Sequence, residues 1–224
     1  MIESYILETA GIALSPEQAG KLNEYCSLLQ EWNLKFNLTA ITNKEDIFIK
    51  HFADSILGAF ALEHGAEVCD IGSGGGFPAM PLKIARPDIK ITMLDSVAKK
   101  TEFLLFVSER LNLGAEIFCV RAEEFGRKEA FDAVTARAVA AMPTLLEYAA
   151  PLLRIGGKAV LYKAAGEDVS ASANAQKILG MELAEARDFV LPNGDGRVIY
   201  IFEKIKATDP RFPRRGNKPR KASL

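Results

Sequence analysis

The sequence is poor in the residues that build disulfide frameworks and metal sites. It holds three cysteines, Cys26, Cys69 and Cys119, and two histidines, His51 and His64, in 224 residues. The cysteines are odd in number and far apart, and two lie in apolar strand-like runs, so we interpret them as reduced core residues. The histidines form no ligand cluster with them. The sequence therefore predicts neither disulfides nor a metal site.

Long apolar runs are also missing. No stretch approaches the ~18 apolar residues needed to cross a bilayer, and the N-terminal residues 1–5 lack the basic region of a signal peptide. Hydrophobic residues make up 49% and charged residues 25%, which is typical of a soluble globular protein. We therefore expect a cytoplasmic monomer that has no membrane partner and consists of one domain with an extension.

The net charge of −1 conceals an uneven distribution. Residues 206–224 hold seven Lys or Arg against Asp209 alone, a net +6, whereas the rest holds 21 basic and 28 acidic residues, a net −7. A basic tail on an acidic body predicts a polyanionic partner, although a solvated, disordered terminus is the simpler alternative. Three prolines and Gly216 argue against a helix in this tail.

The first 64 residues carry helical signals and no strand pattern. Ser15 and Gln18 form a capping-box pattern around Pro16, and apolar residues then recur every three or four positions as far as Phe36. A second helix is predicted over residues 44–61. We therefore expect residues 1–64 to form a helical segment packed on the core.

Strands and helices alternate from residue 65 onward. Strands are predicted at 66–71, 89–95, 115–120, 131–136, 158–163, 184–191 and 197–204, and helices at 79–86, 97–112, 142–153 and 167–179. Such alternation predicts a parallel sheet covered on both faces, and residues 192–196 predict a final antiparallel hairpin. The fold class is therefore α/β, with a Rossmann-like, seven-stranded, mostly parallel sheet over 65–205 followed by the 206–224 tail.

A glycine-rich turn follows the first predicted strand. Residues 70–76 place Asp70 two residues before Gly72, with Gly74 next in an acid-x-Gly-x-Gly-x-Gly pattern. Glycine lets a ligand lie on the main chain, and in α/β chains this turn commonly holds a nucleotide-like cofactor. A dinucleotide fingerprint needs a third glycine where this chain has Phe77. The pattern resembles motif I of S-adenosylmethionine-dependent methyltransferases, but by itself it also fits an ordinary strand-to-helix turn.

Other candidate cofactor residues end the next two strands. Asp95, followed by Ser96, can accept both ribose hydroxyls of an adenosine, or it can cap the following helix. Ala122 and Glu123 suit an adenine edge, although Glu123 can equally be a surface carboxylate. Phe77 can pack beside the cofactor or belong to the core.

Two cationic residues end the fourth and fifth strands. Arg137 and Lys163 should face the substrate side of a methyl donor, where they could position a carboxylate or a phosphate. Structural ion pairs are an equally good interpretation of both residues.

Missing motifs narrow the chemistry. The fourth strand lacks the Asn/Asp-Pro-Pro-aromatic signature of exocyclic amine methylation, and no cysteine lies where base C5 methylation needs its nucleophile. The Tyr-x-x-x-Lys pattern of short-chain dehydrogenases is also absent, because Tyr162 and Lys163 are adjacent. A target that already offers a lone pair, such as guanine N7, needs neither a base nor a nucleophile.

With these motifs, the chain resembles the bacterial 16S rRNA guanine-N7 methyltransferases, also called glucose-inhibited division protein B. The resemblance covers about residue 15 to the end and rests on residues 32–33, 37–39, 51–55, 70–78, 94–96, 135–138 and 212–219. Ala79 departs from the family's usual glycine, and Ala222-Ser223 from its usual ending.

The resemblance implies an S-adenosylmethionine site and an rRNA substrate. It carries over Gly72, Phe77, Ala122, Glu123 and Arg137 as cofactor contacts, and it implies as substrate a guanine in the decoding-region loop of 16S rRNA, presented as free RNA, an assembly intermediate or the 30S subunit. It gives His51, Asp54 and Ser55 no contact, and packing of the N-terminal helices accounts for them equally well. A nucleotide-dependent oxidoreductase and a non-catalytic RNA-binding module are the competing hypotheses.

Overall fold

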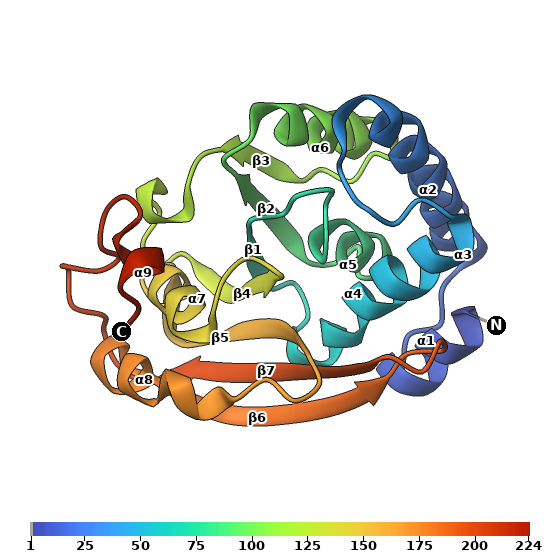
Figure 1. Ribbon diagram of the computed structural model, residues 1–224. Coiled ribbons are helices and arrows are strands. Elements are labelled where there is room, and N and C mark those ends of the chain that lie inside the picture. The colour runs from blue at the N-terminus through green and yellow to red at the C-terminus, as the bar shows by residue number, and fades with distance from the viewer. Residues whose placement is uncertain (1) are drawn as a thin grey trace.

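A single seven-stranded sheet forms the centre of the protein (Figure 1), in a computed structural model that describes residues 2–224. The strand order is β3-β2-β1-β4-β5-β7-β6. The first five strands run parallel, and β7 pairs antiparallel with both β5 and β6. The strands are β1 (Glu67–Ile71), β2 (Lys90–Asp95), β3 (Glu116–Cys119), β4 (Phe131–Arg137), β5 (Leu153–Ala164), β6 (Met181–Val190) and β7 (Gly196–Lys204).

All seven predicted strands are present, and the α/β fold class is confirmed. β5 shows the largest difference, because it begins at Leu153 instead of residue 158, with a register shift in its pairing to β4. The glycines at 156 and 157 hid this start, since they weaken a strand pattern without preventing strand pairing.

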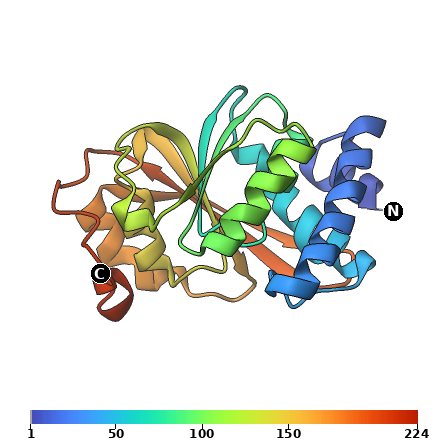
Figure 2. The same cartoon turned by 90° about the horizontal axis from the view of Figure 1, so that it is seen from above.

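Helices cover both faces of the sheet, as the view from above shows (Figure 2). One face of the sheet is covered by the helices of the N-terminal segment together with α5 and α6. The other face is covered by α7 and α8. Alternate residues of β1 enter different cores, Val68 on the first face and Cys69 on the second, as a strand's two-residue period requires. The helices after β1 are α5 (Ala79–Ala85), α6 (Ala98–Arg110), η3 (Ala122–Glu124), α7 (Met142–Ala149), η4 (Val169–Ser172), α8 (Ala173–Leu179) and α9 (Lys218–Lys221).

The N-terminal segment is helical. The capping box at Ser15 and Gln18 is present at the start of α2. The second predicted helix is a continuous helical run that changes type along its length, including a π-helical part. The elements are α1 (Ile2–Ala10), α2 (Pro16–Phe36), α3 (Lys44–Asp46), η1 (Ile47–Ala53), α4 (Asp54–Ile56) and η2 (Leu57–Ala61).

Two expectations are corrected. Cys119 is exposed rather than part of the core, because β3 is the edge strand of the sheet. The C-terminal tail is ordered and contains the four-residue helix α9, which starts where Pro219 fits a first helical turn. Phe212 and Pro219 are buried, so the tail is docked on the domain rather than dispersed in solvent.

Within residues 2–224, no helix combines the length and apolar character that crossing a membrane requires. The same residues contain no group of three His, Cys, Asp or Glu side chains arranged to hold a metal ion.

Candidate cofactor site

The glycine turn is held against the end of β2. The backbone N–H groups of Gly72 and Ser73 both donate to the Leu94 carbonyl, at 2.8 and 3.0 Å. Gly72 and Gly74 have positive φ angles of 69° and 57°, which glycine adopts without steric cost. The turn therefore presents bare backbone at the carboxyl end of the sheet, where open α/β sheets bind ligands.

Close packing also requires glycine at positions 72 and 76. A Cβ atom on Gly72 would lie 2.8 Å from Cγ2 of Val139, in the loop after β4. On the other side, the Tyr25 hydroxyl from α2 donates to the Gly75 carbonyl, and a Cβ atom on Gly76 would collide with that hydroxyl. The helical N-terminal segment thus supports the glycine turn through Tyr25 of α2.

Asp95 joins the turn to the start of α6. One carboxylate oxygen accepts from the Gly74 N–H at 2.8 Å, and the other accepts from the Val97 N–H at 2.9 Å. Each oxygen keeps a further lone pair, so Asp95 can still accept a ribose hydroxyl. Both predicted uses of this carboxylate are therefore compatible with one geometry.

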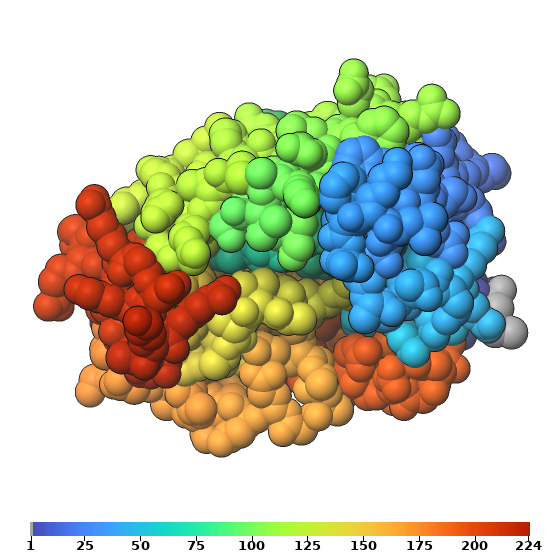
Figure 3. Space-filling model, turned by 45° about the horizontal axis from the view of Figure 1, so that its top comes forward, coloured from blue at the N-terminus to red at the C-terminus, as the bar shows by residue number. Residues whose placement is uncertain are grey.

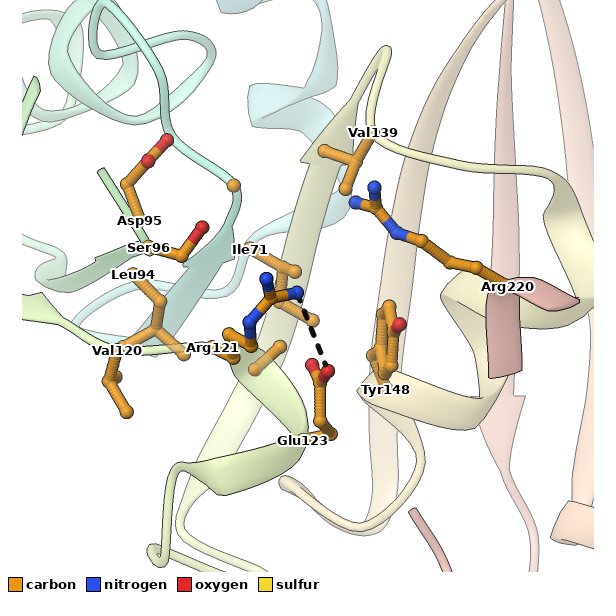
Figure 4. Close-up of a pocket in the computed structure, with 12 residues that line it drawn as sticks. Ile71, Leu94, Asp95, Ser96, Val120, Arg121, Glu123, Val139, Tyr148 and Arg220 are labelled. Atoms are coloured by element: carbon orange, nitrogen blue, oxygen red, sulfur yellow. Dashed lines mark ion pairs between the residues drawn. The ribbon is translucent and has the colours of Figure 1, made fainter. Parts of the chain in front are cut away.

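A small cavity lies beside the turn (Figure 4). Its volume is about 50 Å³, below the ~300–1,000 Å³ usual for small-molecule sites. The side chain of Val139 packs over Gly72 and fills part of this region, so a nucleoside-sized ligand requires the loop after β4 to shift. The cavity is lined by Ile71, Gly72, Leu94, Asp95, Ser96, Val120, Arg121, Ala122, Glu123, Val139, Tyr148 and Arg220.

The cavity unites five of the predicted cofactor residues from three loops. These are Gly72, Asp95, Ser96, Ala122 and Glu123. They are brought together because β1, β2 and β3 are parallel neighbours whose carboxyl ends share one edge of the sheet.

One carboxylate oxygen of Glu123 is free to accept a hydrogen bond from a ligand. Its side chain is only 4% exposed, and its Oε1 atom has no hydrogen-bond partner within residues 2–224. Arg121 approaches no closer than 4.0 Å. A buried carboxylate oxygen without a donor is costly, and an amine such as the exocyclic group of adenine would satisfy it. The residues present therefore fit an adenosine-containing cofactor.

Asp70 lies under the turn rather than on the cavity wall. It is fully buried, and one of its oxygens accepts from the Thr135 hydroxyl at 2.7 Å, while Oδ2 has no partner in the described chain. Burial raises the pKa of Asp70 to about 7, against the lowering effect of its hydrogen bonds. Asp70 therefore supports the glycine turn from within the core. Because none of its atoms is exposed, a direct contact between Asp70 and the cofactor stays a prediction.

Arg137 is held in a cluster with the N-terminal segment. Its Nη1 donates to Asp54 at 2.8 Å and to the Lys50 carbonyl at 3.0 Å, and its Nη2 donates to His51 Nδ1 at 3.0 Å. Its guanidinium lies 5.1 Å from the centroid of Phe77. Neither Arg137 nor Phe77 lines the cavity, so a direct cofactor contact for either one stays a prediction.

His51 is neutral in this cluster. Because arginine can only donate, Nδ1 must accept and Nε2 carries the hydrogen that bonds to Thr39 Oγ1 at 2.8 Å. Burial, followed by the neighbouring Arg137, lowers the pKa of His51 to about 3. The ring also stacks on Phe77 with centroids 4.1 Å apart. His51 and Asp54 thereby tie the N-terminal helices to the end of β4.

Lys163 does not join Arg137. Its Nζ pairs with Glu167 at 2.6 Å and donates to the Ala140 carbonyl at 3.0 Å, with only 8% of the side chain exposed. These contacts match the structural alternative stated for this residue, and a positioning role stays a prediction.

Three cavity residues lie outside the motifs that predicted the site. Val139 lacked any motif, and Tyr148 and Arg220 come from α7 and the C-terminal tail. The positive charge of the tail was visible, but its position beside the glycine turn depends on docking across the molecule.

The chain is similar along most of its length to proteins named rRNA small subunit methyltransferase G. The family model for rRNA small subunit methyltransferase G matches residues 18–189. A protein of Exiguobacterium sibiricum named ribosomal RNA small subunit methyltransferase G is 43% identical, over 97% of this chain and 96% of that protein. A protein of the same name from Streptococcus pyogenes serotype M12 is 42% identical over the same shares.

The fold is also similar to that of solved structures. The structure of M. jannaschii TYW2 in complex with AdoMet aligns with a TM-score of 0.56 and 14% identity, over 68% of this chain and 75% of that one. At this identity the likeness concerns the fold alone, and it confirms the predicted Rossmann-like class. The matching family model and the two relatives confirm the predicted family: the chain belongs to the rRNA small subunit methyltransferase G family.

Proposed function

We propose that the protein transfers a methyl group from S-adenosylmethionine to N7 of a guanine in 16S rRNA. The observation that carries the proposal is the pair of hydrogen-bond acceptors beside the glycine turn, on Asp95 and Glu123, which line one cavity although they lie 28 positions apart in the chain. S-adenosylmethionine supplies an activated methyl group on a positively charged sulfur. The protein's part is to bind, orient and exclude water.

The residues around the site suit a target that needs no deprotonation. Both nitrogens of His51 are engaged, and its pKa of about 3 makes it a poor proton acceptor. Asp70 is enclosed beneath the turn. Guanine N7 offers its own lone pair, so a direct displacement requires positioning rather than a catalytic base.

The tail offers a limited set of charges to RNA. Arg214 is bound to Glu147 and Arg211 to Asp209, and the exposed Arg220 lines the cavity. The other four cations of the tail, Lys206, Arg215, Lys218 and Lys221, are exposed and form no ion pair within residues 2–224. We expect these four to contact phosphates. Replacing any one by alanine should reduce the magnitude of the log-log salt slope of RNA binding by ~0.7–0.9.

Nucleoside mass spectrometry of 16S rRNA tests the proposal directly. A strain lacking the gene should lose one N7-methylguanine, and a plasmid copy of the chain should restore it. Persistence of that nucleoside in the deletion strain contradicts the proposed function. A plasmid copy carrying Asp95→Asn, whose amide cannot accept from both N–H groups, serves as the site-specific control.

The form of the substrate requires a separate experiment. We propose that the protein acts in the cytoplasm as a monomer on the 30S subunit or its assembly intermediate. Transfer of a radiolabelled methyl group to 30S subunits and to free 16S rRNA should differ, with the subunit as the better acceptor. Equal transfer to free rRNA would contradict the need for a folded particle.

A further inference from the structure

The C-terminal tail lies against the cofactor cavity. In the space-filling view (Figure 3) the red C-terminal segment borders the yellow-green surface that follows β3 and β4. Arg220 of this segment lines the cavity together with Tyr148 and Glu123. Figure 4 shows its guanidinium extended from α9 toward Val139, on the same side of the cavity as Tyr148.

The tail is fixed in this place by an ion pair between Arg214 and the buried Glu147. Glu147 of α7 has a fully buried side chain, and it accepts from the backbone N, Nε and Nη2 of Arg214 at 2.8, 2.9 and 2.6 Å. Pro219 lies five residues after Arg214, and its carbonyl accepts from the Thr144 hydroxyl at 2.9 Å. Arg214 Nη2 also donates to the Ala222 carbonyl at 2.8 Å, just after α9. Contacts at Pro219 and Ala222 therefore fix the backbone on both sides of Arg220.

The lining of the cavity suits a flat aromatic base. Ile71, Leu94 and Val120 give it apolar surface, and Glu123 holds a buried acceptor without a donor. Burial and the Glu123 carboxylate raise the pKa of Tyr148, whereas the neighbouring Arg220 guanidinium lowers it. A planar guanidinium at this edge can stack on the face of a base while the carboxylate accepts from its amine.

We propose that Arg220 is a cofactor-binding residue that covers the adenine ring, and that the docked tail is one wall of the cofactor site. The inference rests on the proposed methyl donor and extends it to a residue from outside the strand-end motifs. The exposed Arg215 and Lys221 flank the same segment, so RNA held by the tail would lie next to the covered cofactor.

Calorimetry without RNA tests this proposal independently of the methylated position. Arg220→Ala should weaken S-adenosylmethionine binding about tenfold, the size of a lost cation–π contact of roughly 1.4 kcal/mol. The matched control is Arg211→Ala, an exposed arginine of the same tail that pairs with Asp209 and lies outside the cavity. Its affinity should equal that of the unmodified protein.

A second probe identifies which part of the cofactor Arg220 contacts. 5′-Methylthioadenosine carries the adenosine but lacks the amino and carboxylate groups of methionine, so Arg220→Ala should weaken its binding by the same factor. Unchanged affinity for both ligands overturns the proposal. A loss for S-adenosylmethionine alone also overturns it, because the contact would then be to the methionine carboxylate rather than the base.

Discussion

The buried carboxylate of Asp70 should give folding stability an unusual dependence on pH. The side chain is fully buried, and its pKa is raised from 3.8 to about 7, chiefly by burial. Folded protein therefore keeps this proton up to about pH 7, whereas the unfolded chain releases it near pH 4. Between these values the unfolded state binds fewer protons, so the contribution of Asp70 to stability falls as pH rises.

The size of this contribution follows from the shift. A difference of about three pKa units corresponds to about 4 kcal/mol at 1.36 kcal/mol per unit, of which about 3 kcal/mol falls between pH 5 and pH 8. Asp70→Asn abolishes the titration. Its amide would place an unpaired donor where Oδ2 now has no partner, a cost of roughly 1–3 kcal/mol that does not vary with pH.

Urea unfolding of both proteins at several pH values, without cofactor, measures the effect. The stability of Asp70→Asn relative to the unmodified protein should rise by about 3 kcal/mol from pH 5 to pH 8. Thr135→Val removes the hydrogen bond that lowers the Asp70 pKa, so it should carry the fall in stability to higher pH. Parallel pH profiles for Asp70→Asn and the unmodified protein would refute the reasoning.

Two further substitutions probe the turn and the Arg137 cluster. Gly72→Ala should lower the free energy of unfolding by about 1–2 kcal/mol because of its positive φ. Adding Val139→Ala should relieve only the clash of the new Cβ atom. If the second change restored the full stability, the conformational cost would be contradicted. Arg137→Ala should lower the free energy of unfolding by about 3 kcal/mol, because the Asp54 side chain, 5% exposed, loses its partner at 2.8 Å and keeps only the Arg197 guanidinium, at 3.5 Å. Asp54→Asn is the control that removes the buried charge, so the double variant should be more stable than Arg137→Ala in the same urea assay; a less stable double variant would count against this account.

Several features could be predicted because their causes are local in sequence. The cap at Ser15, the alternation of strands and helices, and the positive-φ turn at Gly72 and Gly74 each depend on residues within a few positions of one another. The parallel order then places the strand ends together, which is why Asp95 and Glu123 were predicted at one site.

Other features depend on contacts between distant segments. Arg137 sits at a strand end as predicted, but its partners Asp54 and His51 come from a helix more than 80 positions earlier. Sequence pattern could not separate an ion pair from a ligand contact, because both place the same residue type at the same strand end.

The sequence by itself determined the family, the order of the elements and the glycine turn with its neighbouring strand ends. Only the tertiary structure decided that Asp70 is enclosed, that Lys163 is paired with Glu167, and that the tail brings Arg220 to the cofactor cavity. The physical reason is that burial and ion pairing depend on which surfaces dock: the Glu147 carboxylate fixes Arg214 across 67 positions of chain, and no local pattern encodes that meeting.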